Sequence, residues 1–344
     1  MSVDAQPVQN ADAARATRRE RTAWFVLAIL LLFSIAAPLN QFKVPPILPI
    51  LMNAFQLSVG RAGLLMSVFA VTGLVLALPA GFIFQRMGYR ITGLTAGGSI
   101  VIGAILGATS SGMGVMLTSR VIEGIGTSFM AVLAPAVIAV WFAAEKRGAA
   151  MGIWSAWVPI GSTAMLILAP TLSQGANWQA VWWFGCVYAL LATALFLVFV
   201  KPASNDSLAS GPQAAPPPMA SAMQVLRNRD ERPYMLGLAL MAVVMPLIAV
   251  MGTGALIVPV IAQGLFGGLV PTNVFSAGVE VVKDERLGGL AMGVIMVGQN
   301  AGMLLGPIVF GVLVESAGGW QVAFGSLAIM CLLGALAGWL AKAR

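Results

Sequence analysis

Ten long apolar segments divide this chain and limit its fold more than any other feature. They span residues 22–52, 62–82, 91–109, 113–141, 149–172, 179–200, 234–251, 254–279, 288–314 and 320–341. Each approaches or exceeds the roughly 20 residues that cross a bilayer as a helix, and each is too long for a buried strand. Gly and Pro recur inside them, which membrane helices tolerate because neighbouring helices satisfy the freed backbone groups. The sequence therefore predicts an all-α, polytopic membrane protein of about ten transmembrane helices.

The composition excludes most familiar active sites. Charged residues make up 9% of the chain and histidine is absent. Without histidine there is no Ser-His-Asp triad, no Cys-His pair, no HExxH zinc site and no His-ligated haem. Cys186 and Cys331 both lie inside apolar segments, where a thiol is usually a small packed hydrophobe. We expect no enzymatic activity, no bound metal and no cofactor.

Basic residues gather in alternate connections between the apolar segments. Sixteen of the nineteen follow this pattern: Arg15, Arg18, Arg19, Arg21, Arg86, Arg90, Lys146, Arg147, Lys201, Arg227, Arg229, Arg232, Lys283, Arg286, Lys342 and Arg344. The positive-inside rule places these connections in the cytoplasm. We therefore predict a multi-pass protein of the inner (cytoplasmic) membrane with both termini cytoplasmic. Because the charges are dispersed and form no basic face, nucleic acid is not an expected partner.

The same pattern suggests four regions. Residues 1–21 form a cytoplasmic tail, and residues 22–200 form a bundle of six helices. Residues 201–232 are polar and include Pro216-Pro217-Pro218, which is typical of a linker. Residues 233–344 hold the four remaining segments and form a half-bundle.

The second half of the chain repeats part of the first. A shift of about 140 residues aligns Met151-Gly152-Ile153 with Met292-Gly293-Val294, and Trp178-Gln179 with Trp320-Gln321. The four C-terminal segments therefore repeat the third to sixth segments. Parallel repeats are typical of one class of secondary transporters, whose substrate site lies between the halves near the midplane.

Three motifs resemble those of the major facilitator superfamily. The stretch from Gly81 to Arg90, which includes Arg86 and Gly88, resembles its cytoplasmic loop motif. Arg120, followed by two glycines, resembles its helix-four motif, and the Gly- and Pro-bearing segment 152–170 is similar to its helix-five motif. The loop motif departs from the family pattern at one position, because Gln85 stands where an acidic residue is usual. This resemblance implies a secondary transporter that works by alternating access.

The predicted architecture departs from that family in helix number. Members have two bundles of six helices, whereas six plus four are predicted here. By resemblance, the missing pair is the seventh and eighth helices, and the seventh faces the first across the substrate cavity. Two alternatives to a working transporter follow: a non-transporting remnant, and a protein completed by homodimerisation.

Two embedded cations, Lys43 and Arg120, are the main candidate site residues. A charge in hydrocarbon costs about 2.5–3.5 kcal/mol on insertion scales, so such residues usually face a cavity or a partner. Three prolines follow Lys43 within six positions and cannot donate backbone hydrogen bonds. They predict a locally unwound polar pocket that includes Asn40 and Gln41. The alternative is that Lys43 extends its amine to the outer interface.

Arg120 lies three residues before Glu123, on the same helical face. The two side chains either neutralise each other, or Arg120 binds an anion and modulates a proton on Glu123. In the second half, Asn273, Gln299 and Asn300 are further candidates for substrate binding. Amides on bundle helices also serve as plain interhelical hydrogen-bonding groups.

These features together predict a transporter of a small solute. Two embedded cations against one embedded acid favour a small organic or inorganic anion, with a proton as the candidate coupling ion. The expected partners are this small-molecule solute, the lipid bilayer and, in the dimer alternative, a second copy of the chain.

Overall fold

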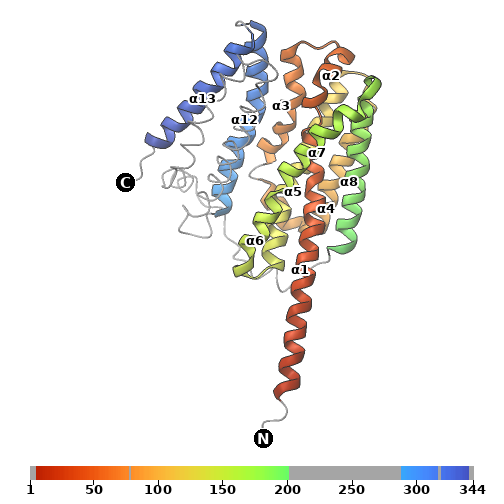
Figure 1. Ribbon diagram of the computed structural model, residues 1–344, viewed down its shortest axis with the longest axis vertical. Coiled ribbons are helices and arrows are strands. Elements are labelled where there is room, and N and C mark those ends of the chain that lie inside the picture. Colours follow the sequence, from red (N-terminus) through yellow and green to blue (C-terminus); the bar gives the residue numbers. More distant parts are fainter. Residues whose placement is uncertain (1–4, 77–78, 201–287, 317–318, 341–344) are drawn as a thin grey trace. The chain divides into compact units, whose positions relative to one another are not determined.

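The computed structural model describes residues 5–76, 79–200, 288–316 and 319–340, and every element in these ranges is helical (Figure 1). Seven helical segments of this described part are long and apolar enough to cross a membrane: Glu20–Phe55, Val59–Leu76, Arg86–Ala108, Met113–Trp141, Glu145–Leu172, Gln179–Phe199 and Val297–Glu315. A shorter apolar helix spans Trp320–Leu336. The predicted all-α membrane fold is confirmed. The segments predicted at 234–251 and 254–279 lie outside the described residues, so the total of ten stays a prediction.

The chain divides into two compact units. The first comprises residues 1–55 and 79–211, and the second comprises residues 56–78 and 212–344. Residues 59–76 therefore pack with the helix at 288–316, although the predicted six-helix bundle of residues 22–200 includes them. The linker predicted at 201–232 lies outside the described residues, and its bounds stay a prediction.

The first apolar segment is broken. Helix α1 (Ala5–Gln41) is followed by a turn at residues 42–44, the short 3-10 helix η1 (Pro45–Ile47) and α2 (Leu48–Phe55). Pro45 and Pro46 supply no backbone donor, so the α-helical ladder cannot continue through them. The single span predicted at 22–52 is therefore two helices joined by an irregular stretch, and Lys43 lies in that stretch.

The loop motif is more helical than the sequence suggests. Helix α4 (Pro79–Ala108) runs through it, with a kink at Gly88, where φ is 67° and ψ is 167°. This positive φ suits glycine because it has no Cβ. The predicted connection between residues 82 and 91 thus reduces to a one-residue kink.

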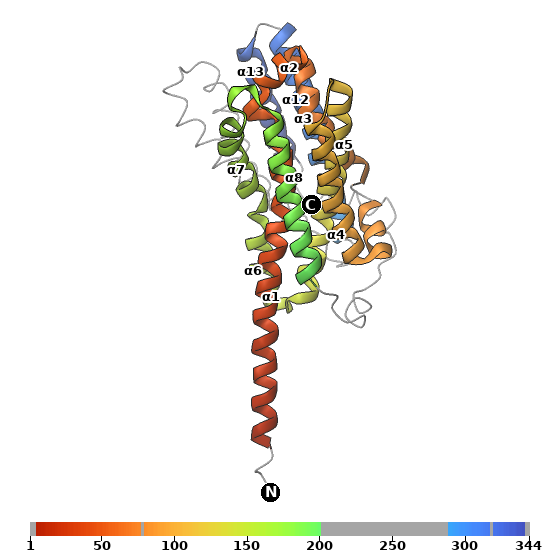
Figure 2. The same cartoon turned by 90° about the vertical axis from the view of Figure 1, so that its right-hand side faces the viewer.

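Five more helical elements lie in the described part of the first unit. Helix α5 (Met113–Trp141) is followed by α6 (Ala144–Ser155) and α7 (Trp157–Leu172), so the span predicted at 149–172 is interrupted at Ala156. The short helix η2 (Gln174–Ala176) leads into α8 (Gln179–Phe199). Helix α4 packs against α5 and α8, while α1 packs against α7 and α8 (Figures 1 and 2).

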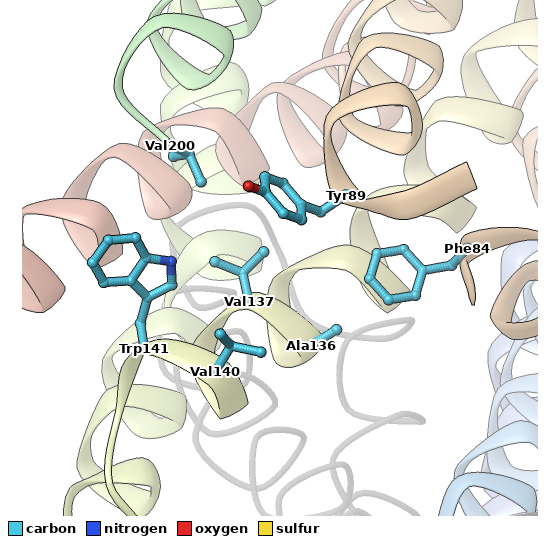
Figure 3. A pocket seen from close by; sticks show the side chains of 7 residues that line it. All are labelled: Phe84, Tyr89, Ala136, Val137, Val140, Trp141 and Val200. Atoms are coloured by element: carbon cyan, nitrogen blue, oxygen red, sulfur yellow. The ribbon is translucent and has the colours of Figure 1, made fainter. Parts of the chain in front are cut away.

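Several helix ends meet at one end of the first unit. Lys146, at the start of α6, forms an ion pair with Glu20 of α1. Tyr89 of α4, Trp141 of α5 and Val200 after α8 line one pocket at this end (Figure 3). The basic pairs Arg86/Arg90 and Lys146/Arg147 therefore lie at the end of the unit where α1 carries Glu20, as the alternating charge pattern predicts.

The second unit contains α3 (Val59–Leu76), α12 (Gly288–Ser316) and α13 (Trp320–Leu340) among its described residues. Glycine allows α3 and α12 to approach closely: a Cβ on Gly63 would lie 2.6 Å from the carbonyl oxygen of Pro307. At the end of this contact, the amide of Gly60 donates to Oε1 of Glu315 at 2.9 Å. An acceptor from α12 thus satisfies a donor in the first turn of α3.

Candidate functional site

The break after α1 places a lysine inside the first unit, within the apolar helical segment Glu20–Phe55. Lys43 lies two residues beyond the last residue of α1 and is 0% exposed. Arg120 lies seven residues after the start of α5, which is about 10 Å along a helix, and is also 0% exposed. Both cations are therefore covered by protein, and Lys43 does not extend to the outer interface as the alternative required.

Glu123 bridges the two cations. Its Oε1 lies 2.5 Å from Nζ of Lys43, and its Oε2 lies 2.6 Å from Nη1 of Arg120. All three side chains are fully buried, so the carboxylate uses both of its oxygens on charged donors. The predicted pairing of Arg120 with Glu123 is present, and Lys43 joins it from the turn after α1. We call Lys43, Arg120 and Glu123 the charge cluster.

Arg120 also caps the C-terminal end of α1. Its Nη1 donates to the carbonyl of Asn40 at 2.6 Å, and its Nη2 donates to the carbonyl of Gln41 at 2.8 Å. The last carbonyls of a helix lack intrahelical partners and carry the negative end of the helix dipole. The planar guanidinium can serve two carbonyls and a carboxylate at once, so it links α5 to the end of α1.

Lys43 has two further contacts. Its Nζ donates to Oδ1 of Asn40 at 2.9 Å and lies 4.5 Å from the centre of a ring of Trp182 in α8. A cation over the face of an indole is attracted by the ring quadrupole. The amide nitrogen of Asn40 donates to the carbonyl of Ala36 at 2.9 Å and more weakly to that of Gly185 at 3.4 Å. Asn40 thereby orients its oxygen toward the lysine.

Glycines in neighbouring helices make room for this arrangement. A Cβ on Gly103 of α4 would lie 2.6 Å from Cγ of Glu123. A Cβ on Gly107 would overlap the indole of Trp182, and one on Gly185 would overlap the carboxamide of Asn40. Any larger residue at these positions would therefore displace a member of the site or the residue that contacts it.

The site has the chemistry of ion binding. The guanidinium of Arg120 and the ammonium group of Lys43, set against the carboxylate of Glu123, give a net charge of +1 when all three are ionised. Among the described residues, no group of three or more His, Cys, Asp or Glu side chains is placed to hold a metal ion. The carboxylate of Glu123 can therefore change its hydrogen-bond partners or take up a proton. The two neighbouring cations can attract an anion.

The structure brings five of the predicted site residues together: Asn40, Gln41, Lys43, Arg120 and Glu123. Gln41 takes part through its backbone carbonyl.

The other predicted site residues lie elsewhere. Asn273 is outside the described residues. Gln299 and Asn300 belong to α12 in the second unit, where Gln299 is exposed and Asn300 faces Gly73 of α3. In the loop motif, Gly81 and Gly88 lie in α4, and Arg86 and Arg90 are exposed at the end of the unit that holds Glu20.

Trp182 and the three glycines beside the site are not predicted from the sequence. Nothing in the sequence separates Trp182 from the other eight tryptophans. The glycines belong to runs that indicate close helix packing in general and do not show which side chain fills the space. Only the packing of α4 and α8 against α1 and α5 identifies them.

The model of the family described as "Major Facilitator Superfamily" matches residues 30–230 and again residues 217–344. The chain belongs to the major facilitator superfamily. As a superfamily member with seven described candidate spans, it is a multi-pass membrane protein. The resemblance seen in the loop and helix-four motifs is thereby confirmed.

Among curated relatives, the chain is 27% identical over 180 residues to the uncharacterized MFS-type transporter YcnB of Bacillus subtilis, covering 51% of this chain and 37% of YcnB. It is 23% identical over 211 residues to protein spinster of Drosophila melanogaster, covering 61% of this chain and 35% of spinster. The matched part thus spans little more than a third of these relatives.

Solved structures of superfamily transporters have the same fold. The inward-open xylose transporter XylE from E. coli aligns with a TM-score of 0.76 at 13% identity, over 92% of this chain and 95% of that one. The human organic anion transporter MFSD10 aligns with a TM-score of 0.67 at 16% identity, over 94% and 99%.

Proposed function

We propose that this chain is a secondary transporter that moves a small solute across the cytoplasmic membrane by alternating access and catalyses no chemical reaction. The observation that carries the proposal is the buried charge cluster at the break of α1. Three ionisable side chains at membrane depth cost several kcal/mol to insert, so they are usually functional. Broken helices with charged partners at their ends are also a feature of transporter binding sites.

The charge balance favours an anionic solute. Lys43 and Arg120 together exceed Glu123 by one positive charge, and a small organic or inorganic anion would offset it. Glu123 is the candidate proton carrier, because protonation would weaken its attraction for both cations. A proton would then couple to the rearrangement of Lys43 and Arg120. The remaining partners in this proposal are the bilayer and, where one copy leaves the path open, a second copy of the chain.

Reconstituted transport tests this function. Proteoliposomes containing the full chain would be preloaded with one unlabelled solute from a panel of small carboxylates, phosphate and neutral sugars, and counterflow of its labelled form would be measured. We expect counterflow of at least one anion, reduced at least tenfold by Lys43→Ala and by Arg120→Ala. In vesicles that contain no internal solute, internal acidification reported by pyranine during net solute uptake would identify proton coupling.

Each negative result has its own meaning. If Lys43→Ala and Arg120→Ala leave counterflow unchanged, Lys43 and Arg120 do not form an anion site, although the protein still transports a solute. No counterflow of any solute would favour the non-transporting remnant. Counterflow only under conditions where a cross-linked dimer persists in mild detergent would favour completion by a second copy.

A further inference from the structure

We propose that the charge cluster selects a monovalent anion over a dianion or a neutral solute, and that the indole N–H of Trp182 contributes to binding. This inference rests on the proposed transport function and names its substrate class. Lys43, Arg120 and Glu123 have a net charge of +1 when all three are ionised, and all three are 0% exposed. At this depth an unbalanced charge is costly, and one negative charge on a solute cancels it. A dianion would leave the site negative, and a neutral solute would leave it positive.

Trp182 supplies an independent observation. Its side chain is 0% exposed, and its Nε1 has no hydrogen-bond acceptor among the described residues. Buried donors are normally paired, because an unpaired one loses its hydration without compensation. The same side chain contacts Nζ of Lys43 through its ring face. The Nε1 edge of this indole faces Gly107 of α4, and its ring face contacts the cluster. An anion that enters between the ring and the cluster would give the unpaired donor an acceptor and offset the positive charge.

The two cations contribute differently to this selection. Arg120 is held by two carbonyls of α1 in addition to Glu123, so moving it would uncap the helix. Lys43 lies in the turn between α1 and η1, and its partners are side chains: Glu123, Asn40 and Trp182. Lys43 can therefore turn from Glu123 to a solute without disturbing a helix end. Arg120 remains in place and keeps its charge near the solute.

Ligand-induced stabilisation of the full-length protein in detergent tests the selection. The probes are benzoate and nitrate as monoanions, phthalate and sulfate as dianions, and benzamide as a neutral analogue of benzoate. All are added at pH 7.5 in a dilute zwitterionic buffer that contains no chloride and no carboxylate, and the anions are compared at equal ionic strength. We expect a saturable rise in unfolding temperature with at least one monoanion, and an affinity at least tenfold weaker for its paired dianion and for benzamide. Equal responses within each pair, or no response to either monoanion, would overturn the proposal.

Variants that alter the net charge sharpen the test. Lys43→Met makes the net charge zero and should abolish the monoanion response. Glu123→Gln makes it +2 and should shift the preference toward phthalate or sulfate. If Glu123→Gln does not fold, the wild-type comparison and Lys43→Met still decide the question. A monoanion response that survives unchanged in Lys43→Met would contradict the proposed site.

A matched pair of variants tests the role of Trp182. Trp182→Phe keeps an aromatic face for Lys43 and removes the N–H, so monoanion affinity should fall about tenfold, as expected for one lost hydrogen bond to a charged group. Trp183→Phe changes the next residue, which is 45% exposed, and should leave affinity unchanged. Equal affinities in the two variants would remove Trp182 from the site.

Binding and transport fail separately. If the protein exchanges a neutral sugar but binds neither monoanion, the proposed transport function stands and the proposed monoanion selectivity is wrong. If the protein binds benzoate or nitrate selectively but shows no counterflow, the proposed binding site stands and the proposed transport function is wrong.

Discussion

Lys43 and Arg120 carry the same charge but depend on different chemistry. The guanidinium of Arg120 donates to the carbonyls of Asn40 and Gln41 while pairing with Glu123. Its flat, forked geometry suits several fixed acceptors at once. Lys43 is a point charge that contacts a carboxylate, an amide oxygen and a ring face. At the scale of single residues, Arg120 joins two helices, and Lys43 provides the charge that can change partners.

Glu123 should therefore be the most sensitive residue of the charge cluster. Glu123→Gln leaves two buried cations without a counter-charge, and losing one partner of a buried pair costs about 3–5 kcal/mol. The double variant Lys43→Met with Glu123→Gln removes the positive charge that has fewer backbone partners, so it should be more stable than Glu123→Gln alone. Denaturant unfolding in detergent micelles would measure both free energies of unfolding.

A matched control exists in α6. Glu145 is exposed, so Glu145→Gln should change the free energy of unfolding by less than about 0.5 kcal/mol. Equal losses for Glu123→Gln and Glu145→Gln would mean that the charge cluster contributes nothing to folding. A double variant no more stable than Glu123→Gln would show that Lys43 and Arg120 do not repel each other.

At the scale of helices, the break of α1 could be predicted from the sequence and its partner could not. Pro45, Pro46 and Pro49 indicate that a helix cannot run through Lys43, and the structure ends α1 at Gln41. The position of Arg120 near the start of an apolar segment indicates its depth. The sequence does not show that α5 packs so that Arg120 meets the end of α1, because this depends on side chains of α4, α7 and α8 that fill the space between them.

Gly103 of α4 tests whether close packing places Glu123. A Cβ at Gly103 would lie 2.6 Å from Cγ of Glu123 and 2.8 Å from the carbonyl oxygen of Ser119. Because the carbonyl cannot move without moving α5, Gly103→Ala should destabilise the protein by about 1–3 kcal/mol. Gly98, in the same helix, has nothing within 4 Å of its Cβ position, so Gly98→Ala should be nearly neutral. Thermal unfolding in detergent would rank the two, and equal stabilities would contradict the described α4 packing.

Gly63 offers the corresponding test in the second unit. Its Cβ position lies 2.6 Å from the carbonyl oxygen of Pro307, so Gly63→Ala should push α3 away from α12. The hydrogen bond from Gly60 to Glu315 should weaken with it, and amide hydrogen exchange over residues 59–63 should become faster by roughly fivefold or more, as a loss of about 1–3 kcal/mol implies. Gly306→Ala lies on α12 with open space around its Cβ position and serves as the control. Unchanged exchange in Gly63→Ala would mean that α3 and α12 do not pack as described.

At the scale of the whole molecule, composition and periodicity suffice for the fold class, because hydrocarbon accepts few backbone arrangements. The family follows from the loop and helix-four motifs, whose residues are contiguous in the sequence. The site was only partly predictable. Lys43, Arg120 and Glu123 stand out as charges in apolar segments, whereas Trp182 and Gly103 look like ordinary membrane residues. What distinguishes those two is their neighbours from other helices, and such contacts leave no pattern along one chain.

The charge distribution also makes a prediction for the orientation of the whole chain. Positive connections stay in the cytoplasm, so Ser111, in the uncharged connection between α4 and α5, should face outward. Gly148, beside Lys146 and Arg147 at the start of α6, should face inward. In a background with Cys186→Ser and Cys331→Ser, a membrane-impermeant maleimide should label Ser111→Cys in spheroplasts. It should label Gly148→Cys only after permeabilisation.

Fusions at the chain ends complete this orientation test. An even number of spans returns the chain to its starting side, so green fluorescent protein fused to either terminus should fold and fluoresce in the cytoplasm. The C-terminal fusion is the more informative one, because its location depends on every span between Lys201 and Arg344, including those predicted at 234–251 and 254–279. A dark C-terminal fusion beside a fluorescent N-terminal one would require an odd number of spans. It would contradict the pairing of helices on which the predicted six-plus-four architecture rests.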